Sequence, residues 1–190
     1  MGYTLDILTE KDLKLEVLKK YDAIIVGIRA YNMYAFLTEK NEALNQYIEQ
    51  GGNLIVQYLK SNQVGINKVK VGPYPFTVNA GKRVTQENVP VEFVLPSHTV
   101  LNFPNKIEKF DLDHWVQERS TYMAENVDAH FEAPLSMNDK GESPSTGSLL
   151  IAPFGKGNMV YLSLVLFRQL PAGNAGAYKL LANLISLPKH

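Results

Sequence analysis

The chain has 190 residues, of which 45% are hydrophobic, and its 19 basic and 19 acidic side chains give a formal net charge of zero. A chain of this length can bury a sizeable core as one domain. The balanced charge creates no field that would attract nucleic acid or an anionic membrane surface, so we expect neither as a partner. No apolar run approaches the roughly 20 residues that cross a bilayer, so we expect no membrane insertion.

Cysteine is absent from the chain. Its absence excludes disulfides, thiolate metal sites and any mechanism that uses a cysteine nucleophile. The first residues, MGYTLDIL, show neither a basic leader region nor a signal-type apolar segment. These features leave the cellular compartment open.

The first part of the chain alternates strand and helix patterns. TLDIL (4–8) alternates like a strand, and Thr9 with Asp12 predicts a cap for a helix over 10–20. The runs YDAIIVGI (21–28) and NLIVQYL (53–59) are continuously apolar, which is typical of strands buried on both faces of a parallel sheet. Between them we expect a helix that Thr38 caps and Gly51-Gly52 closes, with Ala43, Leu44, Tyr47 and Ile48 on one face.

The later part shows a different pattern. KVKVGPYPFTV (68–78) predicts a short strand that ends in a Pro-broken loop, and VPVEFVLP (89–96) predicts another strand. NDKGESPSTG (138–147) has the composition of a polar loop. GSLLIAPF and NMVYLSLVLF flank Gly155-Lys156-Gly157 and predict a β-hairpin. A helix over 174–186 would turn Ala177, Leu180, Leu181, Leu184 and Ile185 inward.

These elements together predict one domain over residues 1–190 with a three-layer, flavodoxin-like α/β sandwich. Strand–helix alternation indicates right-handed βαβ units on a mostly parallel sheet, and the late hairpin adds an antiparallel element.

Polar residues that follow predicted strands are the first candidates for a binding site, because ligands of open parallel sheets bind beyond the carboxyl ends of the strands. The candidates for ligand binding are twelve such residues or their neighbours in the DHWVQERS stretch: Arg29, Tyr31, Asn32, Gln57, Tyr58, His98, Trp115, Gln117, Glu118, Arg119, Arg168 and Gln169. The four arginines all lie in compact polar clusters (GIRAYN, GKRVT, VQERS and LFRQL). This placement favours fixed, fork-shaped hydrogen bonding to carboxylates or carbonyls.

Two interpretations of this pattern stay open. In the functional one, Arg29, Arg168, Glu118 and His98 converge on a ligand that carries hydroxyls or a carboxylate, and aromatic side chains such as Tyr58 stack on sugar faces. In the structural one, which we weight more heavily, Glu118 pairs with an arginine and braces loops. His98 with Glu118 or Asp113 would be the acid–base pair if the protein were an enzyme.

Other mechanisms lack their motifs. The histidines show no metal-binding spacing, and Asp111, Asp113 and His114 form only an acidic run of the kind that usually binds nothing. The chain has no GxSxG elbow and no GxGxxG run. Gly155-Lys156-Gly157 lacks the spacing of a phosphate loop. We therefore expect no metal and no cofactor.

YDAIIVGIRAYN, a helix that ends in YIEQGGNLIVQY, and GKGNMVYLSL resemble the class I glutamine amidotransferase-like superfamily, in particular its ThuA-like branch. More narrowly, GIRAYN, GPYP, HTVLNFPNKI, WVQER and FRQLPAGNAGAYKLLANLISL resemble the C-terminal domain of large PIG-L (LmbE-like) deacetylase-family proteins of Bacteroidetes type. Superfamily members open with a strand and helix before the segment that TLDIL matches. The resemblance therefore implies a fragment of a longer chain that lacks the first βα unit.

The departures from the family shape the functional expectation. Glutaminases of the superfamily carry their cysteine just after the strand that NLIVQYLKSNQ matches, where Gln57 or Tyr58 stands here, and the PIG-L zinc motif is also missing. The resemblance thus implies a non-catalytic accessory domain that binds a carbohydrate-related ligand or supports a deacetylase domain on the same polypeptide. It also implies a periplasmic or secreted location. A cysteine-free sugar-processing enzyme and a pure interaction domain, including one that self-associates through an exposed sheet edge, are the alternatives.

Overall fold

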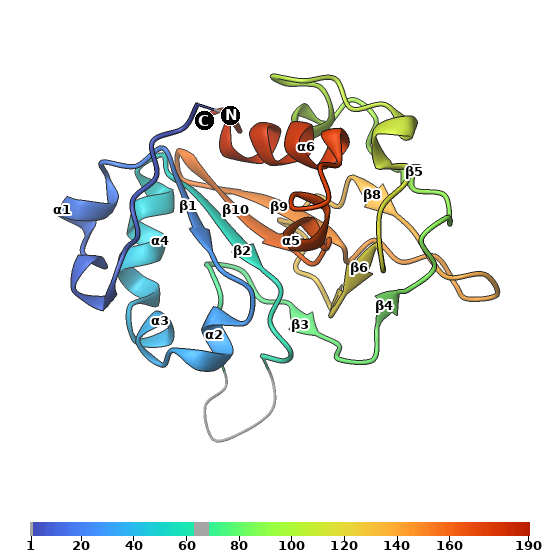
Figure 1. Cartoon of the computed structure of the whole chain (residues 1–190). Helices are drawn as coiled ribbons and strands as arrows, with labels where there is room; N and C mark the ends of the chain where they lie inside the picture. The colour runs from blue at the N-terminus through green and yellow to red at the C-terminus, as the bar shows by residue number, and fades with distance from the viewer. Residues whose placement is uncertain (1, 63–68) are drawn as a thin grey trace.

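The computed structural model describes residues 2–62 and 69–190, which form a sheet with helices on both faces and an irregular β-rich region at one side (Figure 1). The central sheet has the order β1-β2-β10-β9 and comprises β1 (Ala23–Val26), β2 (Asn53–Gln57), β10 (Gly157–Leu162) and β9 (Leu149–Phe154). β1, β2 and β10 are parallel, and β9 is antiparallel to β10. The mostly parallel α/β fold and the late hairpin are confirmed.

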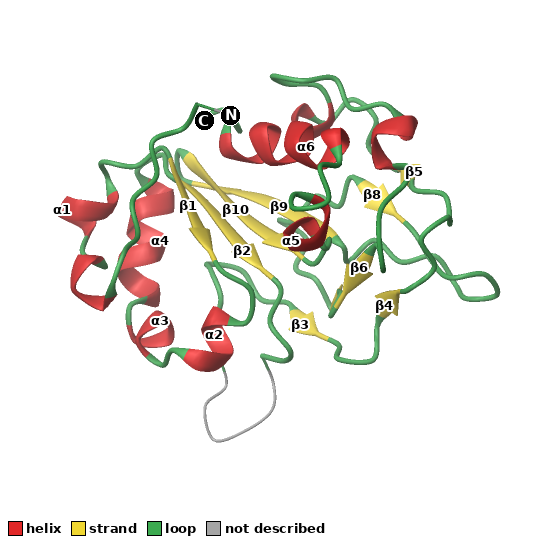
Figure 2. Ribbon diagram, viewed as in Figure 1, coloured by secondary structure: helices red, strands yellow, loops and turns green. Residues whose placement is uncertain are grey.

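Alternate residues of each strand pack against opposite faces of the sheet. In β2, Leu54 and Val56 join one core, which α4 (Asn41–Glu49) covers through Leu44 and Ile48. Ile55 joins the other core, which α6 (Ala175–Ile185) covers. Two apolar cores, one on each side of the strands, are the consequence of side chains that alternate along fully buried strands, and Figure 2 shows the resulting layers.

The remaining elements are short. They are the 3₁₀ helices η1 (Glu10–Asp12), η2 (Thr99–Leu101) and η3 (Lys109–Leu112), and the helices α1 (Leu15–Leu18), α2 (Ala30–Met33), α3 (Phe36–Glu39) and α5 (Leu166–Gln169). Three two-residue strand pairs complete the fold: β3 (Thr77–Val78) with β7 (Ala124–Glu125), β4 (Arg83–Val84) with β6 (Ser120–Thr121), and β5 (Glu92–Phe93) with β8 (Leu135–Ser136).

Two predictions near the N-terminus are wrong. TLDIL (4–8) forms no strand, because it has no partner for a ladder, and Leu5 and Ile7 are 84% and 89% exposed. The helix expected over 10–20 is divided into η1 and α1, since Lys14 adopts an extended backbone between them. Its expected start is present, however: the Thr9 N–H donates to the Asp12 carboxylate at 2.8 Å.

Three further boundaries differ from expectation. Thr38 lies inside α3 instead of capping the next helix, which begins after Lys40 without a side-chain cap. Within 89–96 only β5 forms, because Pro90 and Pro96 lack the N–H that a longer ladder needs. Within 68–78 only β3 forms, after a turn in which Gly72 has a φ of 70°; residue 68 is outside the described residues.

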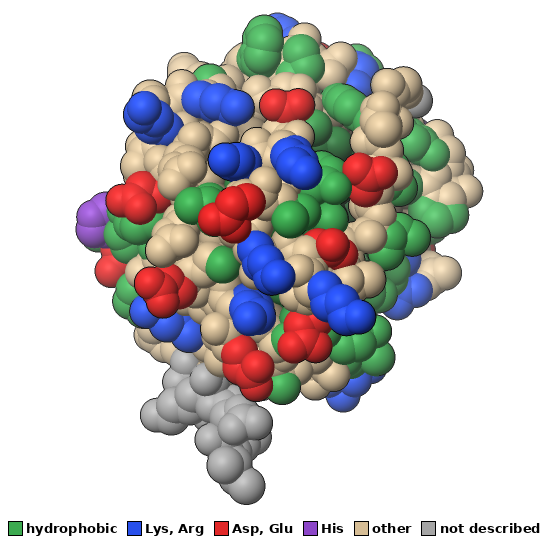
Figure 3. Space-filling view, turned by 90° about the vertical axis from the view of Figure 1, so that its left-hand side faces the viewer, with side chains coloured by type: hydrophobic (Ala, Val, Ile, Leu, Met, Phe, Trp, Pro, Cys, Tyr) green, Lys and Arg blue, Asp and Glu red, His purple; other side chains and the backbone are tan. Residues whose placement is uncertain are grey.

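The two outermost strands of the sheet differ. On the outer side of β9, Ile151 forms a β-bridge with Glu132, whereas β1 is the last strand on the opposite side of the sheet. On the face of the molecule at the left of Figure 1, Lys and Arg side chains alternate with Asp and Glu side chains, so this face carries no field of a single sign (Figure 3). None of the helices in the described residues is long and apolar enough to cross a membrane.

Candidate functional site

The carboxyl ends of β1, β2 and β10 meet at one edge of the sheet, and three of the predicted residues follow them there. Arg29 comes three residues after β1, Tyr58 directly follows β2, and Arg168 lies on α5 after β10. The Arg29 N–H donates to the Tyr58 carbonyl at 2.8 Å, so the ends of two neighbouring strands are tied together. This edge is where ligands of open α/β sheets bind.

Glu118 joins this edge to the β-rich region. Its Oε2 accepts from Arg83 Nη2 at 2.5 Å, and its Oε1 accepts from Arg168 Nη2 at 3.2 Å. The Glu118 side chain is only 6% exposed, whereas those of Arg83 and Arg168 are 48% and 34% exposed. The hydrogen bond to Glu118 raises the pKa of the Arg83 guanidinium. The carboxylate therefore lies between two guanidinium groups, and each of its oxygens accepts from one of them.

Aromatic rings line the same edge. The Tyr58 ring stacks on Tyr122 at 5.2 Å and lies 5.5 Å from Phe167, and the Arg168 guanidinium lies 5.1 Å from the Phe167 ring. Burial raises the pKa of the Tyr58 hydroxyl, Tyr122 adds to that effect, and Arg29 and Arg168 oppose it. At neutral pH Tyr58 is thus an uncharged donor close to two arginines. We call Arg29, Tyr58, Arg83, Glu118, Tyr122 and Arg168 the arginine–tyrosine cluster.

The backbone is unusual around this cluster. Arg29, Gln117 and Tyr122 have φ values of 57°, 70° and 57°, in the left-handed region that side chains other than Gly seldom adopt. Gln117 is fixed on both sides: its Oε1 accepts from Arg168, and its N–H donates to Glu87. Strained backbone persists only where its surroundings hold it, and it gathers at functional sites.

Other predicted residues near this edge serve the loops themselves. The Asn32 amide accepts from the Lys60 N–H at 2.7 Å and donates to the Ser61 carbonyl at 3.1 Å, so it links the loops after β1 and β2. Tyr31 is the buried residue of α2, only 3% exposed, and burial raises the pKa of its hydroxyl. Gln57 is the half-buried last residue of β2.

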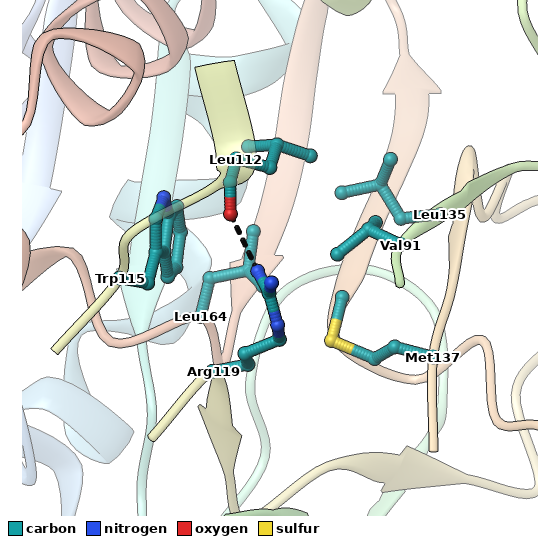
Figure 4. Close-up of a pocket in the computed structure, with 7 residues that line it drawn as sticks. All are labelled: Val91, Leu112, Trp115, Arg119, Leu135, Met137 and Leu164. Atoms are coloured by element: carbon teal, nitrogen blue, oxygen red, sulfur yellow. Dashed lines mark hydrogen bonds between the residues drawn. The ribbon is translucent and has the colours of Figure 1, made fainter. Parts of the chain in front are cut away.

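Trp115, Arg119 and Gln169 were candidates for ligand contacts, and the structure places all three in the interior. Figure 4 shows Trp115 and Arg119 in an apolar pocket with Val91, Leu112, Leu135, Met137 and Leu164, which leaves no room for a water molecule. Arg119 Nη1 donates to the Leu112 carbonyl at 2.6 Å, and burial lowers the pKa of its guanidinium. Gln169 is fully buried and bonds the backbone of Val116 in both directions.

His98 and Glu118 do not form the expected acid–base pair. His98 Nδ1 accepts from the Val100 N–H at 3.0 Å, and its Nε2 lies 2.9 Å from Glu132. Both nitrogens thus have partners that start η2 and tie it to the β9 edge, while Glu118 is occupied by arginines. The predicted pair is wrong because His98 is engaged by Val100 and Glu132, whereas Glu118 is engaged by Arg83 and Arg168.

The acidic run before Trp115 is also divided among structural roles. Asp111 pairs with Lys179 at 2.7 Å and accepts from the Glu108 N–H, whereas Asp113 and His114 are exposed. Across residues 2–62 and 69–190 no group of three or more His, Asp or Glu side chains is placed to hold a metal ion.

A second hollow, of about 330 Å³, lies beside the loop of residues 69–76. Its lining consists of residues 69–76 and Asn62, and its titratable side chains are Lys70 and Tyr74. The Asn62 amide already bonds the Phe76 carbonyl and the Val78 N–H. Titratable groups do not converge there as they do at the arginine–tyrosine cluster, which is therefore the candidate site.

Sequence reasoning missed Arg83 as a site residue. It lies on β4, which is only two residues long, and it reaches Glu118 from 35 positions away. The available signal was its place in a compact polar cluster, GKRVT, one of the four that contain the chain's arginines.

Comparisons with known proteins support the fold. No family model matches the chain, and no curated protein does. A ThuA-like protein from Bacteroides uniformis has a structure that aligns with 98% of this chain and 79% of its own, at 20% identity and a TM-score of 0.60. A cytoplasmic protein from Salmonella typhimurium aligns with 93% of this chain and 75% of its own, at 13% identity and a TM-score of 0.56.

A larger enzyme also contains this fold. A β-galactosidase from Rahnella sp. R3 aligns over 90% of this chain but only 23% of its own length, at 14% identity and a TM-score of 0.51. At these identities the similarity establishes the fold alone. The chain therefore has the α/β fold of the ThuA-like structure, with an arginine–tyrosine cluster at the carboxyl edge of its sheet.

Proposed function

We propose that this chain is a non-catalytic accessory domain whose arginine–tyrosine cluster binds a small carbohydrate-related ligand. The observation that carries the proposal is the convergence of Arg29, Tyr58 and Arg168 at the carboxyl edge, around a carboxylate that is already neutralised. This arrangement offers hydrogen-bond donors and apolar ring surface, and it holds no group poised as a nucleophile.

Two further points favour a carbohydrate and a binding role. A part of this fold occurs within a β-galactosidase, and the chain lacks the cysteine that glutamine hydrolysis in the superfamily requires. The resemblance to PIG-L-associated domains extends the proposal: a deacetylase domain on the same polypeptide would act on the ligand that this domain holds.

The proposal is tested by thermal shift and calorimetry with a panel of neutral, amino and acidic sugars. We expect at least one class to raise the melting temperature, and we expect Tyr58→Phe to weaken that response because it removes a donor while keeping the ring. Tyr3→Phe, the same loss of a hydroxyl at an exposed side chain before η1, is the control. The sugar should be recovered chemically unchanged. No response from any class would contradict the proposal, and so would conversion of the sugar.

The free edge of β1 favours a second candidate, an interaction domain that pairs with a second copy of itself. β1 ends the sheet, Ile25 and Ile28 are 41% and 37% exposed, and the neutral AIIV strand carries none of the charges that usually protect an edge. Light scattering across a range of concentrations should show a dimer that Ile25→Lys dissociates and Met33→Lys, on exposed α2, does not. A monomer at every concentration would exclude self-pairing.

A further inference from the structure

We infer that the arginine–tyrosine cluster selects an oxyanion, namely the carboxylate of a sugar acid, and that Arg29 is its principal ligand. The inference rests on the proposed function and specifies the chemical class that the site accepts.

The ion pairs at the cluster leave one arginine without a partner. Arg83 and Arg168 share the carboxylate of Glu118. Two other carboxylates lie near the cluster: Glu87 accepts from the Gln117 N–H, and Asp139 accepts from the N–H groups of Thr85 and Gln86. Neither of them pairs with Arg29, so its exposed guanidinium is the group that attracts an anion.

Arg29 is the arginine of the cluster whose donors stay available to a ligand. Both Glu118 oxygens are taken by Arg83 and Arg168, and within residues 2–62 and 69–190 Arg29 forms no ion pair. Arg168 is already engaged, because its Nη1 and Nη2 donate to Gln117 and Glu118 and its Nε is buried beyond the reach of a ligand.

The shape of these donors fits a planar oxyanion. A guanidinium presents parallel N–H groups that match the two oxygens of a carboxylate, whereas a neutral sugar hydroxyl engages only one of them. The Arg29 side chain is exposed. Its backbone is held in place by its left-handed conformation and by the hydrogen bond that its N–H donates to the Tyr58 carbonyl. The uncharged Tyr58 hydroxyl can donate a further hydrogen bond to an anion.

Calorimetry at constant ionic strength tests the inference with three probes: glucuronate, glucose 6-phosphate and glucose. We expect glucuronate to bind at least about tenfold more tightly than glucose. Glucose 6-phosphate distinguishes the two oxyanions, and tighter binding of the phosphate than of glucuronate would overturn the assignment to a carboxylate. Arg29→Asn should weaken glucuronate binding at least about fivefold and weaken glucose binding by a smaller factor. Asn tolerates the left-handed backbone at this position, so the variant is expected to keep its melting temperature.

The charge-matched control is Lys19→Gln, since Lys19 is exposed and precedes β1 at the opposite end of the strand. It should leave all three affinities unchanged, and Arg29→Lys should restore only part of the binding because it keeps the charge without the fork. Equal binding of glucose and glucuronate, unaffected by Arg29→Asn, would overturn the anion selectivity and leave the proposed function intact. Failure of all three probes, together with the wider sugar panel, would overturn both.

Discussion

Arg168 Nη2 lies 3.2 Å from Glu118 Oε1, which joins α5 to a segment 50 residues earlier in the chain. Arg83 reaches the other oxygen from β4. Three segments that are distant in sequence thus meet on one nearly buried carboxylate, and the loops that carry the candidate site depend on it.

Replacing Glu118 by Gln should lower the free energy of unfolding by about 1–3 kcal/mol, because Arg83 and Arg168 lose the charge of the acceptor that they share. Urea unfolding measures the change, and a double-mutant cycle with Arg168→Gln should give a coupling of about 0.5 kcal/mol or more. Glu92→Gln is the control. Its pair with Lys109 is exposed on both sides, so its effect should stay within about 0.5 kcal/mol. A coupling energy indistinguishable from zero would contradict the interpretation that the Glu118–Arg168 pair stabilises the fold.

Asn183 forms the most complete buried polar contact in α6. Its Nδ2 donates to the carbonyls of Val100 and Asn105 at 2.8 and 2.7 Å, and its Oδ1 accepts from the Asn105 N–H at 2.9 Å. Asn183→Leu should cost about 2–4 kcal/mol, since it leaves the buried Val100 carbonyl and the half-buried N–H and carbonyl of Asn105 without these partners. Asn102→Ala is the comparison, because that exposed amide also donates to two carbonyls and water can replace it. Similar losses of stability in Asn183→Leu and Asn102→Ala would show that the burial of Asn183 does not determine the size of the loss.

The central sheet and its two covering helices could be predicted because their signals are local and long enough to repeat. β2 and β10 are apolar at every position that the two cores bury, and α6 shows its buried face in Ala177, Leu180 and Leu184. The strand pairs of two residues could not be predicted, because two residues establish no period. TLDIL shows the converse: alternation makes a strand only where a partner completes the ladder.

The candidate site was predicted in part. Arg29, Tyr58, Glu118 and Arg168 were identified from their positions after strands or from their polar surroundings, and the structure brings them together. Trp115 and Arg119 carried the same signal but point into the interior. The sequence does not distinguish the two outcomes, because within DHWVQERS the direction of each side chain depends on the left-handed backbone of His114 and Gln117.

His98 makes stability depend on pH. Burial lowers the pKa of its imidazole, and Glu132 opposes that effect only in part. The unfolded chain therefore binds the proton more readily, so His98 contributes stability that is complete above its unfolded value of about 6.5 and is lost as the pH falls. Protonation would also remove the Nδ1 acceptor that caps η2. Melting temperatures between pH 8 and 5 should fall less in His98→Asn, which keeps a cap acceptor without titrating. Identical pH profiles would refute this role.

Gly176 allows α6 to lie directly against η3. A Cβ built there would stand 1.6 Å from the Asp111 carbonyl oxygen, a backbone atom that no rotamer change can move away. Helix propensity alone would make Gly176→Ala stabilising by about 1 kcal/mol. The clash outweighs that gain, so we expect a net loss of at least about 3 kcal/mol. Gly27→Ala, where nothing lies within 4 Å of the added atom, should change stability by less than about 1 kcal/mol in urea unfolding. Because η3 leads directly into the segment that holds Glu118, a Gly176→Ala protein that still folds should also bind the site's ligand more weakly. Wild-type stability in Gly176→Ala would mean that α6 and η3 are not in backbone contact.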